Sequence, residues 1–390
     1  MRALTVLCDR VGDLGGAERY WETVLPALAA RGVRVRLLGR EVADDGAFGV
    51  DARAIRWGGE DGTPSGEAAR EVASELRARP ADAVITASVF DVDVLDAVRD
   101  AAPRWLVKIH DHRSFCPTGD RVFPQFPAPC SARMGTACRA NTLVRGCVHG
   151  PRADSFRKIT ARERLRARIA RADRILVSSR HMRATCVTNG VEGGRLAITP
   201  PPLPDAAFAA SPAPRPPQRT LLFASRLTPR KGLRSLIAAL AHIDAAERPL
   251  LVVAGEGERE ETDAREDAAR LGVRVDWRGK LSAAELRAAL DDAWAVAVPS
   301  LWPEPFGLVG IEAQARGRPA VAYASGGIGD WIDGAGIAVP RGDERALADA
   351  IRRVLDERTW EELAARASVR AQEYRLDAHV ERLMNLCDAA

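Results

Sequence analysis

The chain has 390 residues, of which 46% are hydrophobic and 28% charged, and its 57 basic and 53 acidic residues leave a net charge of +4. This length exceeds that of one ordinary domain and predicts two domains of about 200 residues, each able to bury its own core. The near balance of charge argues against nucleic-acid binding, and no apolar run approaches the roughly 20 residues that a membrane span needs.

Two features of the sequence bear on the cellular compartment. The first ten residues, MRALTVLCDR, predict a short strand and lack the apolar core of a signal peptide. Seven cysteines are an odd number in a long chain, which favours a reducing environment. We therefore expect a cytoplasmic protein.

The N-terminal region begins with a strand, a glycine loop and a helix. Residues 4–8 are apolar, residues 17–31 have helical spacing, and residues 33–38 are expected to form the next strand. Gly15 and Gly16 lie in the loop between the first strand and the helix. Because this loop lacks the G-x-G-x-x-G spacing of a dinucleotide fingerprint, it indicates either a ligand-facing turn or a tight turn without a ligand.

A histidine follows a predicted strand in the same region. Residues 83–86 and 105–109 are expected to be strands, with a helix opening at Asp91 between them. Asp91 and Asp93 form a D-x-D string, but the cap and first turn of a helix explain it better than a metal site does. His110 comes directly after the strand at 105–109, where open parallel sheets gather ligands.

Residues 115–149 hold four of the seven cysteines together with several prolines, and we expect no regular structure there. The cysteines are Cys116, Cys130, Cys138 and Cys147. Their spacing includes no C-x-x-C knuckle, so three alternatives stay open: a structural zinc held by four thiolates, disulfides, or free thiols. The segment lies beside His110 in the sequence, so we expect it to shape an acceptor site and assign it no chemistry.

Two contrasting segments follow. Residues 155–171 predict a basic amphipathic helix, whose arginines either face solvent or contact the headgroups of anionic lipids. Residues 199–218 contain eight prolines in twenty residues and predict an extended linker. That linker divides the chain into nearly equal halves.

The second half begins with a strand at residues 220–224 and a helix at residues 233–241. The loop between them contains Arg226 and Lys231, which stand five residues apart. Cations between a strand end and a helix N-terminus suit a diphosphate, with arginine as a planar fork and lysine as a point charge. Only four of the 57 basic residues are lysines, which sets Lys231 apart.

The stretch from residue 300 to 331 follows another apolar strand, at residues 293–299. Glu304 lies in its loop, and Glu312 lies eight residues later in a helix expected to begin near Gly307. The helical rise puts Glu312 about one and a half turns inside the helix. It leaves Glu304 at the N-terminus of the helix, where backbone N–H groups favour an anion. Two carboxylates beside an anion site suit a polyhydroxyl group attached to phosphate, because carboxylates accept hydrogen bonds from sugar hydroxyls.

These motifs resemble those of a known family. The run PEPFGLVGIEAQARGRP, at residues 303–319, resembles the Glu-x7-Glu signature of the retaining nucleotide-sugar transferases of glycosyltransferase family 4. The loop RLTPRKG, at residues 226–232, is similar to the phosphate-binding loop of the same family. The resemblance implies the GT-B fold, an α/β architecture in which two Rossmann-like, doubly wound domains face one another across a cleft.

The domain division implied by the resemblance has four parts. Residues 1–204, including the cysteine-rich loop 115–149, form an acceptor-binding Rossmann-like domain, and residues 205–219 form the proline-rich linker. Residues 220–372 form the nucleotide-sugar-binding domain. Residues 373–390 form a C-terminal helix that crosses back to the N-terminal domain.

The implied reaction is transfer of a sugar, with retention of configuration, from a nucleoside-diphosphate sugar to a hydroxyl of a glycan, a lipid-linked acceptor or a natural product. A UDP- or GDP-sugar is the more expected donor. No catalytic metal and no obligatory cofactor is expected, because the Arg and Lys clamp supplies the positive charge. A lipid-linked acceptor would place the protein at the inner face of the membrane.

The resemblance also carries over roles residue by residue. The residues expected to act in catalysis are His110, Arg226, Lys231 and Glu304. The residues expected to bind the donor are Gly15, Gly16, Arg226, Lys231, Gly255, Arg278, Glu304, Phe306, Gly307, Leu308 and Glu312. His110 and Glu304 would contact the donor sugar, and Glu312 would contact the ribose. Gly255 and Arg278 lie in turns where family members seat the nucleobase.

Other functions remain open alongside this one. A nucleotide-sugar epimerase or a phosphorylase shares the implied fold, and would turn over donor without an acceptor or with phosphate. A non-catalytic nucleotide-sugar binding protein would bind the same ligand without transferring the sugar. An NAD-dependent dehydrogenase would need the G-x-G-x-x-G loop that this sequence lacks.

Overall fold

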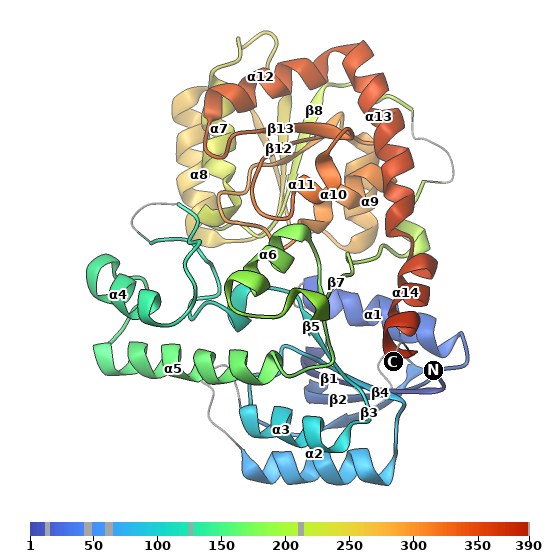
Figure 1. Ribbon diagram of the computed structural model, residues 1–390. Coiled ribbons are helices and arrows are strands. Elements are labelled where there is room, and N and C mark those ends of the chain that lie inside the picture. Colours follow the sequence, from blue (N-terminus) through green and yellow to red (C-terminus); the bar gives the residue numbers. More distant parts are fainter. Residues whose placement is uncertain (12–15, 43–48, 59–64, 125–127, 210–213, 389–390) are drawn as a thin grey trace. The chain divides into compact units, whose positions relative to one another are not determined.

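The protein is described by a computed structural model that covers residues 1–11, 16–42, 49–58, 65–124, 128–209 and 214–388 (Figure 1). The chain divides into two compact units, one made of Met1–Pro202 with Leu376–Ala390 and the other of Leu203–Arg375. Each unit contains one parallel β-sheet with helices on both faces, so the expectation of doubly wound α/β architecture is confirmed for each. The proline-rich stretch 205–219 lies within the second unit.

The sheet of the first unit has the strand order β3-β2-β1-β4-β5-β6-β7, and every neighbouring pair is parallel. Its strands are β1 Ala3–Val11, β2 Arg34–Val42, β3 Asp51–Ala54, β4 Ala83–Ala87, β5 Trp105–Ile109, β6 Arg174–Val177 and β7 Leu196–Ile198. Every residue of β4 and β5 is buried, as expected for parallel strands covered on both faces. Thr86 and Lys108 are therefore polar residues inside the sheet.

Two groups of helices cover this first sheet. The helices are α1 Gly16–Ala29, α2 Gly66–Ala78, α3 Val92–Ala101, α4 Thr136–Arg145, α5 Arg152–Ile169, α6 Arg180–Thr188 and α14 Leu376–Asp388. On one face α1 and α14 share a core, to which Trp21 and Leu383 contribute. On the other face the core includes side chains of α2, α3, α5 and α6. Helix α14, although last in the chain, is thus part of the first unit.

The sheet of the second unit has the order β10-β9-β8-β11-β12-β13 and is also parallel throughout. Its strands are β8 Thr220–Ala224, β9 Leu250–Ala254, β10 Val275–Gly279, β11 Ala295–Val298, β12 Ala320–Tyr323 and β13 Gly336–Val339. Along β8, Leu221 and Phe223 enter one core while Leu222 enters the core on the opposite face. This alternation gives both faces of the sheet an apolar surface.

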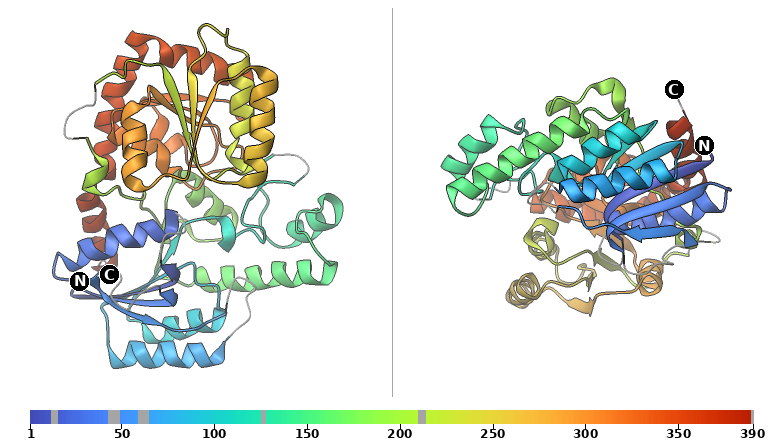
Figure 2. Two further views of the ribbon diagram at one scale, coloured as in Figure 1. Left: turned by 180° about the vertical axis from the view of Figure 1, so that it is seen from behind. Right: turned by 90° about the horizontal axis from the view of Figure 1, so that it is seen from below.

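Helices flank both faces of the second sheet, and in the left view of Figure 2 they stand on either side of its strands. They are α7 Leu233–Ala241, α8 Glu258–Leu271, α9 Ala283–Asp292, α10 Leu308–Ala315, α11 Gly329–Ile332, α12 Glu344–Leu355 and α13 Glu357–Ala371. In α12 the buried Leu347, Ile351 and Val354 recur at helical spacing, so one stripe faces the core. Helix α9 begins with a capping box between Ser282 and Glu285.

The structure corrects one expectation and confirms another. The cysteine-rich segment is not free of regular structure, because its prolines end at Pro129 and α4 forms after them. That helix buries none of its side chains. The reading of Asp91 as a helix cap is confirmed, since its side chain accepts hydrogen bonds from the backbone N–H groups of Asp93 and Val94.

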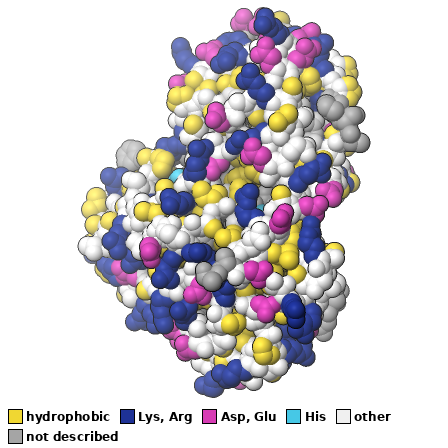
Figure 3. Space-filling view, turned by 45° about the vertical axis from the view of Figure 1, so that its right-hand side comes forward, with side chains coloured by type: hydrophobic (Ala, Val, Ile, Leu, Met, Phe, Trp, Pro, Cys, Tyr) yellow, Lys and Arg dark blue, Asp and Glu magenta, His cyan; other side chains and the backbone are white. Residues whose placement is uncertain are grey.

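The surface carries charges of both signs. On the face shown in Figure 3, basic side chains are interspersed with acidic ones, and hydrophobic side chains are scattered among them. None of the helices in the described ranges is long and apolar enough to cross a membrane.

Candidate functional site

The second unit brings its candidate residues to one point of its sheet. The strand order reverses between β8 and β11, and ligands of open parallel sheets bind beyond the carboxyl ends of the strands at such a point. The loop after β8 carries Arg226 and Lys231, and the loop after β11 carries Ser300 and Glu304. The fold therefore places two loops, far apart in sequence, at the same edge.

A buried ion pair joins these two loops. Lys231 Nζ donates to Glu304 Oε1 at 2.6 Å, and Ser300 Oγ donates to the same oxygen at 2.6 Å. The Glu304 side chain is 5% exposed and that of Lys231 is 19% exposed. The pair therefore lies largely out of water while the lysine keeps one side accessible. Such a pair needs good geometry to offset the cost of desolvation, and the serine hydroxyl adds to it.

The environment of Glu304 keeps its carboxylate ionised. Burial alone would raise the pKa of Glu304. The charge of Lys231 and hydrogen bonds from Lys231, Ser300 and Trp302 outweigh burial, so the net pKa lies below the usual value. At neutral pH the site thus contains a fixed anion bonded to a fixed cation.

Cations surround the neighbouring Trp302 ring. Lys231 Nζ lies 5.4 Å from the ring centroid, and the guanidinium carbon of Arg230 lies 5.3 Å from it. Arg226, by contrast, is exposed and forms no ion pair with any residue in the described ranges. Of the two predicted clamp residues, Lys231 is therefore held in place and Arg226 is accessible to a ligand.

The approach of the two loops depends on a glycine. Gly232, which follows Lys231, has φ of +75°, and a Cβ placed on it would lie 2.0 Å from the carbonyl oxygen of Pro299. The N–H of Leu301 donates to the carbonyl of Arg230 at 2.8 Å, so the loop backbones are also hydrogen-bonded. A larger residue at 232 would separate the strand ends that hold Lys231 and Glu304.

Helix α10 begins four residues after Glu304, at Leu308. Gly307 is its N-cap residue with φ of +93°, and Leu308 is its first residue. Glu312 is half-buried in the second turn, close to the predicted position. Phe306 is buried, and its ring packs edge-on against Tyr374 with centroids 5.7 Å apart. The Phe306 side chain therefore belongs to the core.

The Ser-Gly-Gly turn at residues 325–327 contacts the Glu304 loop. The N–H of Gly327 donates to the carbonyl of Glu304 at 2.7 Å, and Ser325 Oγ donates to the carbonyl of Trp302 at 2.5 Å. Gly326 has φ of +64°, and a Cβ there would lie 2.3 Å from the Glu304 carbonyl oxygen. This turn follows β12, so the end of a third strand helps to hold the Glu304 backbone in place.

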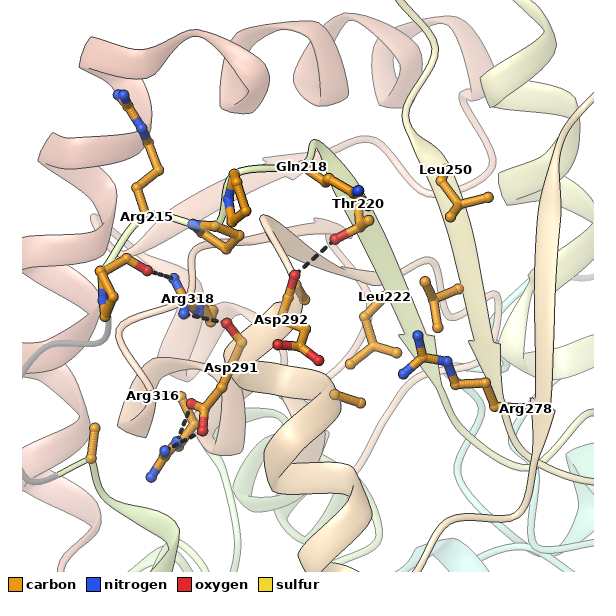
Figure 4. A pocket seen from close by; sticks show the side chains of 17 residues that line it. Arg215, Gln218, Thr220, Leu222, Leu250, Arg278, Asp291, Asp292, Arg316 and Arg318 are labelled. Carbon is orange, nitrogen blue, oxygen red and sulfur yellow. Dashed lines mark hydrogen bonds and ion pairs between the residues drawn. The ribbon is translucent and has the colours of Figure 1, made fainter.

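Arg278 is the fourth residue of β10, and its side chain lines a pocket of about 660 Å³ (Figure 4). Its Nε donates to Asp276 Oδ2 at 2.9 Å. Thr220 and Leu250, the first residues of β8 and β9, line the same pocket, which therefore reaches the amino ends of these strands. The N–H of Gly255, after β9, donates to the carbonyl of Gly279 at 2.7 Å, so the backbone next to Arg278 lies beside Gly255 at the carboxyl ends.

In the first unit, His110 directly follows β5. Its ring packs edge-on against Tyr20, with centroids 5.1 Å apart, and its buried Nε2 has no hydrogen-bond partner among the described residues. Burial, and then the charges of Lys108 and Arg113, hold the pKa of His110 well below its usual value. Gly16 is the first residue of α1, and Gly15 lies outside the described residues.

Two family models match this chain. Residues 15–202 match "Glycosyl transferase 4-like domain" and residues 206–374 match "Glycosyl transferases group 1". The chain belongs to the family-4 glycosyltransferases. The expected family is therefore confirmed, and the two parallel sheets are those of its GT-B fold.

Curated relatives resemble this glycosyltransferase over part or most of its length. The glycogen synthase of Mycobacterium tuberculosis (strain CDC 1551 / Oshkosh) is 34% identical over 190 residues, or 47% of this chain and 42% of the relative. The chain thus spans less than half the length of that relative. The D-inositol 3-phosphate glycosyltransferase of Acidothermus cellulolyticus is 28% identical over 96% of this chain and 86% of its own length.

Solved structures resemble the glycosyltransferase over its whole length. Anabaena Alr3699/HepE in complex with UDP has a TM-score of 0.73 at 18% identity, with 100% of both chains covered. A glycosyltransferase from Rickettsia africae ESF-5 has a TM-score of 0.75 at 14% identity, covering 99% of this chain and 98% of the other. At these identities the similarity establishes the fold.

The four cysteines of the 115–149 segment come close together in the glycosyltransferase. Burial first, and then the charges of Cys116, Cys130 and Cys138, raise the pKa of the Cys147 thiol to about 11, so all four lie within electrostatic range. None of the seven cysteines forms a disulfide bond. Within the described ranges no three His, Cys, Asp or Glu side chains are positioned to hold a metal ion, so the structure offers no arrangement for the zinc alternative.

Sequence reasoning missed Ser300 and Trp302 as parts of the site. Ser300 bonds the Glu304 carboxylate, and Trp302 also bonds that carboxylate while its ring lies beneath the cations of Arg230 and Lys231. One local signal was available for the serine. It comes two residues after the end of β11 and four before Glu304, so it is a polar residue at a strand end beside a predicted site.

Proposed function

We propose that this glycosyltransferase transfers a hexose from a nucleoside-diphosphate sugar to a hydroxyl group with retention of configuration and without a metal ion. The observation that carries the proposal is the Lys231–Glu304 ion pair at the reversal point of the second sheet, with Arg226 accessible in the same loop. A UDP or GDP donor is supported by the similar HepE structures with UDP and UDP-glucose, and by a relative described as GDP-mannose-dependent.

The basic residues of the second unit bind the diphosphate. Arg226 supplies a planar fork and Lys231 a point charge, and both oppose the negative charge that develops on the departing nucleoside diphosphate. The backbone N–H groups at Gly307 and Leu308, at the start of α10, add donors for a phosphate oxygen. These groups supply the positive charge that a metal ion provides in other transferases.

The carboxylates recognise hydroxyl groups. Glu304 accepts a hydrogen bond from the donor sugar with the oxygen that Lys231 and Ser300 leave open. Glu312, in the second turn of α10, accepts from the ribose hydroxyls. The backbone of Gly255, at the end of β9, lies beside the nucleobase. Arg278 lies in the neighbouring strand end, where Gly279 bonds Gly255, and is proposed to serve the same nucleobase site.

The transfer step needs no enzymic nucleophile. The acceptor oxygen attacks the anomeric carbon on the face of the leaving group, and the bond from that carbon to the phosphate oxygen breaks. The proton of the acceptor hydroxyl passes to the released phosphate oxygen. One face is used for both departure and attack, so the configuration is retained.

The first unit binds the acceptor. In our division it consists of residues 1–204 together with residues 373–390, which form its returning helix. The buried Nε2 of His110 supports its role in binding sugar. It has no hydrogen-bond partner among the described residues and would bond a sugar hydroxyl. Gly16, the first residue of α1, lines the same site in this proposal, and Gly15 lies outside the described residues. A lipid-linked acceptor, as in a relative described as a phosphatidyl-myo-inositol mannosyltransferase, would place the enzyme at the cytoplasmic face of the membrane.

Calorimetry with UDP, GDP, ADP and their hexoses tests the donor site. We expect micromolar binding of one nucleotide, weakened at least tenfold by Glu312→Gln and by Arg226→Gln. Matched controls are Glu266→Gln on α8 and Arg353→Gln in the last turn of α12, both exposed, which leave binding unchanged. Absence of binding by every nucleotide would refute the proposed site.

Product analysis tests the reaction. The donor identified by calorimetry is incubated with a panel of hydroxyl acceptors in the presence of EDTA, and the anomeric proton of the product is followed by NMR. We expect transfer with the donor's configuration. Turnover without an acceptor indicates an epimerase, phosphate-dependent turnover a phosphorylase, and binding without turnover a carrier protein; each outcome contradicts the proposal.

A further inference from the structure

A lysine lies fully inside the sheet of the first unit. Lys108, in the middle of β5, is 2% exposed. Its Nζ donates to the carbonyl oxygen of Thr199 at 2.8 Å and to Thr199 Oγ1 at 2.7 Å. Its Nζ also lies 4.9 Å from the centroid of the Tyr20 ring. Within the described ranges it forms no ion pair with a carboxylate.

Such a residue is costly to retain in a core. A buried charge without a counter-ion destabilises a fold by several kcal/mol, and an apolar side chain would fill the same space without that penalty. The chain otherwise uses arginine as its cation, with only four lysines among 57 basic residues. Another lysine of the four, Lys231, lies in the diphosphate loop. These facts favour a functional reason for Lys108.

Lys108 and His110 share one side of the strand. They are two residues apart in an extended run, so their side chains project to the same face. The Tyr20 ring contacts both, with its centroid 5.1 Å from the His110 ring and 4.9 Å from Lys108 Nζ. The ammonium of Lys108 is therefore held next to His110 by Thr199, after β7, and by the ring of Tyr20, on α1.

The cluster extends to the C-terminal helix. The Tyr20 hydroxyl and His379 Nε2 lie 2.8 Å apart, and His379 belongs to α14. Nearby charged groups shift the pKa values in this cluster. Arg113 acts on His110, Arg382 acts on His379, and Cys387 acts on Tyr20. Lys108 acts on both histidines. Arg113 is itself paired with Asp111 at 2.7 Å. Lys108 is thus the buried charge common to both imidazoles.

We propose that Lys108 is a positioning residue for sugar transfer: its ammonium, fixed by Thr199 and the Tyr20 ring, keeps the His110 imidazole neutral and aligned so that Nε2 can bond a hydroxyl of the donor sugar. The inference rests on the role of His110 in the proposed function. A neutral imidazole has one donor and one acceptor, whereas an imidazolium only donates. The lysine thereby preserves both hydrogen-bonding modes at acid pH.

The electrostatics of the cluster agree with this geometry. Burial lowers the pKa of Lys108 to about 7, so it remains charged on the acid side, where the histidine would otherwise become protonated. Burial first, and then the positive charge of Lys108, lowers the pKa of His110. Removing the charge at 108 should therefore let the pKa of His110 rise toward its usual value of 6.5.

The direct test is an NMR titration of histidine-labelled protein without substrate. Lys108→Met removes the charge at similar volume, Lys108→Gln removes the charge but keeps a donor for Thr199, and Lys108→Arg keeps the charge. Lys158→Met, at an exposed position on α5, is the matched control. We expect the pKa of His110 to rise in the Met and Gln variants and to stay low in the Arg variant, the control and the wild type.

The kinetic test uses the donor that calorimetry identifies. In Lys108→Met and Lys108→Gln, kcat/KM should fall at acid pH, where the wild type stays active. The loss should be about tenfold at one pH unit below the raised pKa of His110, and less than about twofold at pH 8.5. The Arg variant should restore the wild-type profile. If Lys108→Met does not fold, as judged by circular dichroism, Lys108→Gln decides.

Two results would overturn the inference. One is an unchanged His110 titration in the neutral variants, and the other is a shifted titration with an unchanged pH profile of kcat/KM. The failure of the proposed function is separate and recognisable. If the wild type transfers no sugar from any nucleotide, the NMR titration still decides whether Lys108 controls the protonation of His110, and the positioning role in transfer is refuted.

Discussion

Lys231 Nζ and Glu304 Oε1 lie 2.6 Å apart, although the two residues are separated by 73 positions in the sequence. The ion pair links the loop after β8 to the loop after β11. The pair fixes the position of the cation relative to the carboxylate. A diphosphate must then compete with Glu304 for the ammonium of Lys231.

That competition predicts opposite effects of Glu304→Gln on binding and on turnover. Without the negative charge, Lys231 is free to bind phosphate, so the affinity for the nucleoside diphosphate should be unchanged or higher. Transfer should fall about 100-fold, the usual cost of losing one oriented polar group at the reacting centre. Calorimetry and initial rates measure the two effects, and weaker nucleotide binding with normal turnover would contradict the assignment.

Removal of the lysine should instead destabilise the second unit. Lys231→Met leaves a 5%-exposed carboxylate without its cation, which costs about 3–5 kcal/mol when one partner of a buried pair is deleted. The double variant with Glu304→Gln should recover much of that loss. Urea denaturation of the four proteins gives the coupling energy, and additive losses would show that the pair contributes no mutual stabilisation.

The pH dependence of this pair has a definite sign. Burial opposes ionisation of Glu304, but Lys231 and the hydrogen bonds hold its folded pKa below 4.5. Stability from the pair is therefore present above pH 4.5 and is lost as pH falls through the folded pKa. In Lys231→Met, only the hydrogen bonds from Ser300 and Trp302 oppose the effect of burial, so Glu304 becomes protonated at higher pH. The difference between variant and wild type should accordingly shrink at acid pH.

Gly326 should tolerate no side chain. Its φ is +64°, and the added Cβ of Gly326→Ala would lie 2.3 Å from a backbone oxygen and 2.5 Å from a backbone nitrogen of Glu304. We expect a loss of about 2–4 kcal/mol from conformational strain and overpacking together. Gly329→Ala is the matched control, because nothing lies within 4 Å of a Cβ there. Equal melting temperatures for the two variants would contradict the described contact.

The first unit should lose stability in acid. Burial, and then the charge of Lys108, lowers the pKa of His379 to about 3, from 6.5. The unfolded chain therefore binds a proton at a pH where the folded one does not, and stability falls as pH decreases from 6.5 toward 3. Urea midpoints between pH 7.5 and 4.5 should decline less steeply in His379→Gln. Parallel curves would show that another group controls the acid sensitivity.

The thiol of Cys147 should react slowly. Its pKa of about 11, against a usual value of 9.0, leaves about 100-fold less thiolate at pH 8. Alkylation by iodoacetamide, followed by mass spectrometry, should therefore be much slower in the folded protein than in urea, and should accelerate toward pH 11. Equal rates in buffer and in urea at pH 8 would refute this environment.

Much of the secondary structure could be predicted from the sequence, because the relevant signals are local. Strands β5 and β8 and helix α7 have the predicted bounds. Each of the two strands is a short, largely apolar run. Strand β7 could not be recognised in this way, since its three residues are only half-buried. Helix α4 escaped notice because it buries no side chain and lacks an apolar stripe.

The candidate site was predictable in its residue types but not in its contacts. Strand ends, glycines and charged residues indicated Arg226, Lys231, Glu304 and Glu312 from spacing alone. That Lys231 bonds Glu304 depends on β8 and β11 being neighbours, which no local pattern expresses. The role of Arg278 stays a prediction. Its backbone lies near the carboxyl end of β10, where Gly279 accepts a hydrogen bond from Gly255, while its side chain bonds Asp276 and lines the pocket of Figure 4.

Helix α14 makes the first unit discontinuous in the sequence. Val380, Leu383 and Cys387 share a core with Trp21 and Leu25, whereas residues 203–375 between them form the second unit. A fragment ending at Pro202 would therefore expose the apolar face of α1, but a fragment of residues 203–375 keeps all its own strands. During synthesis the second unit can fold as soon as it has been made, while the first must wait for the ribosome to deliver α14. The half of the chain made first is thus completed last.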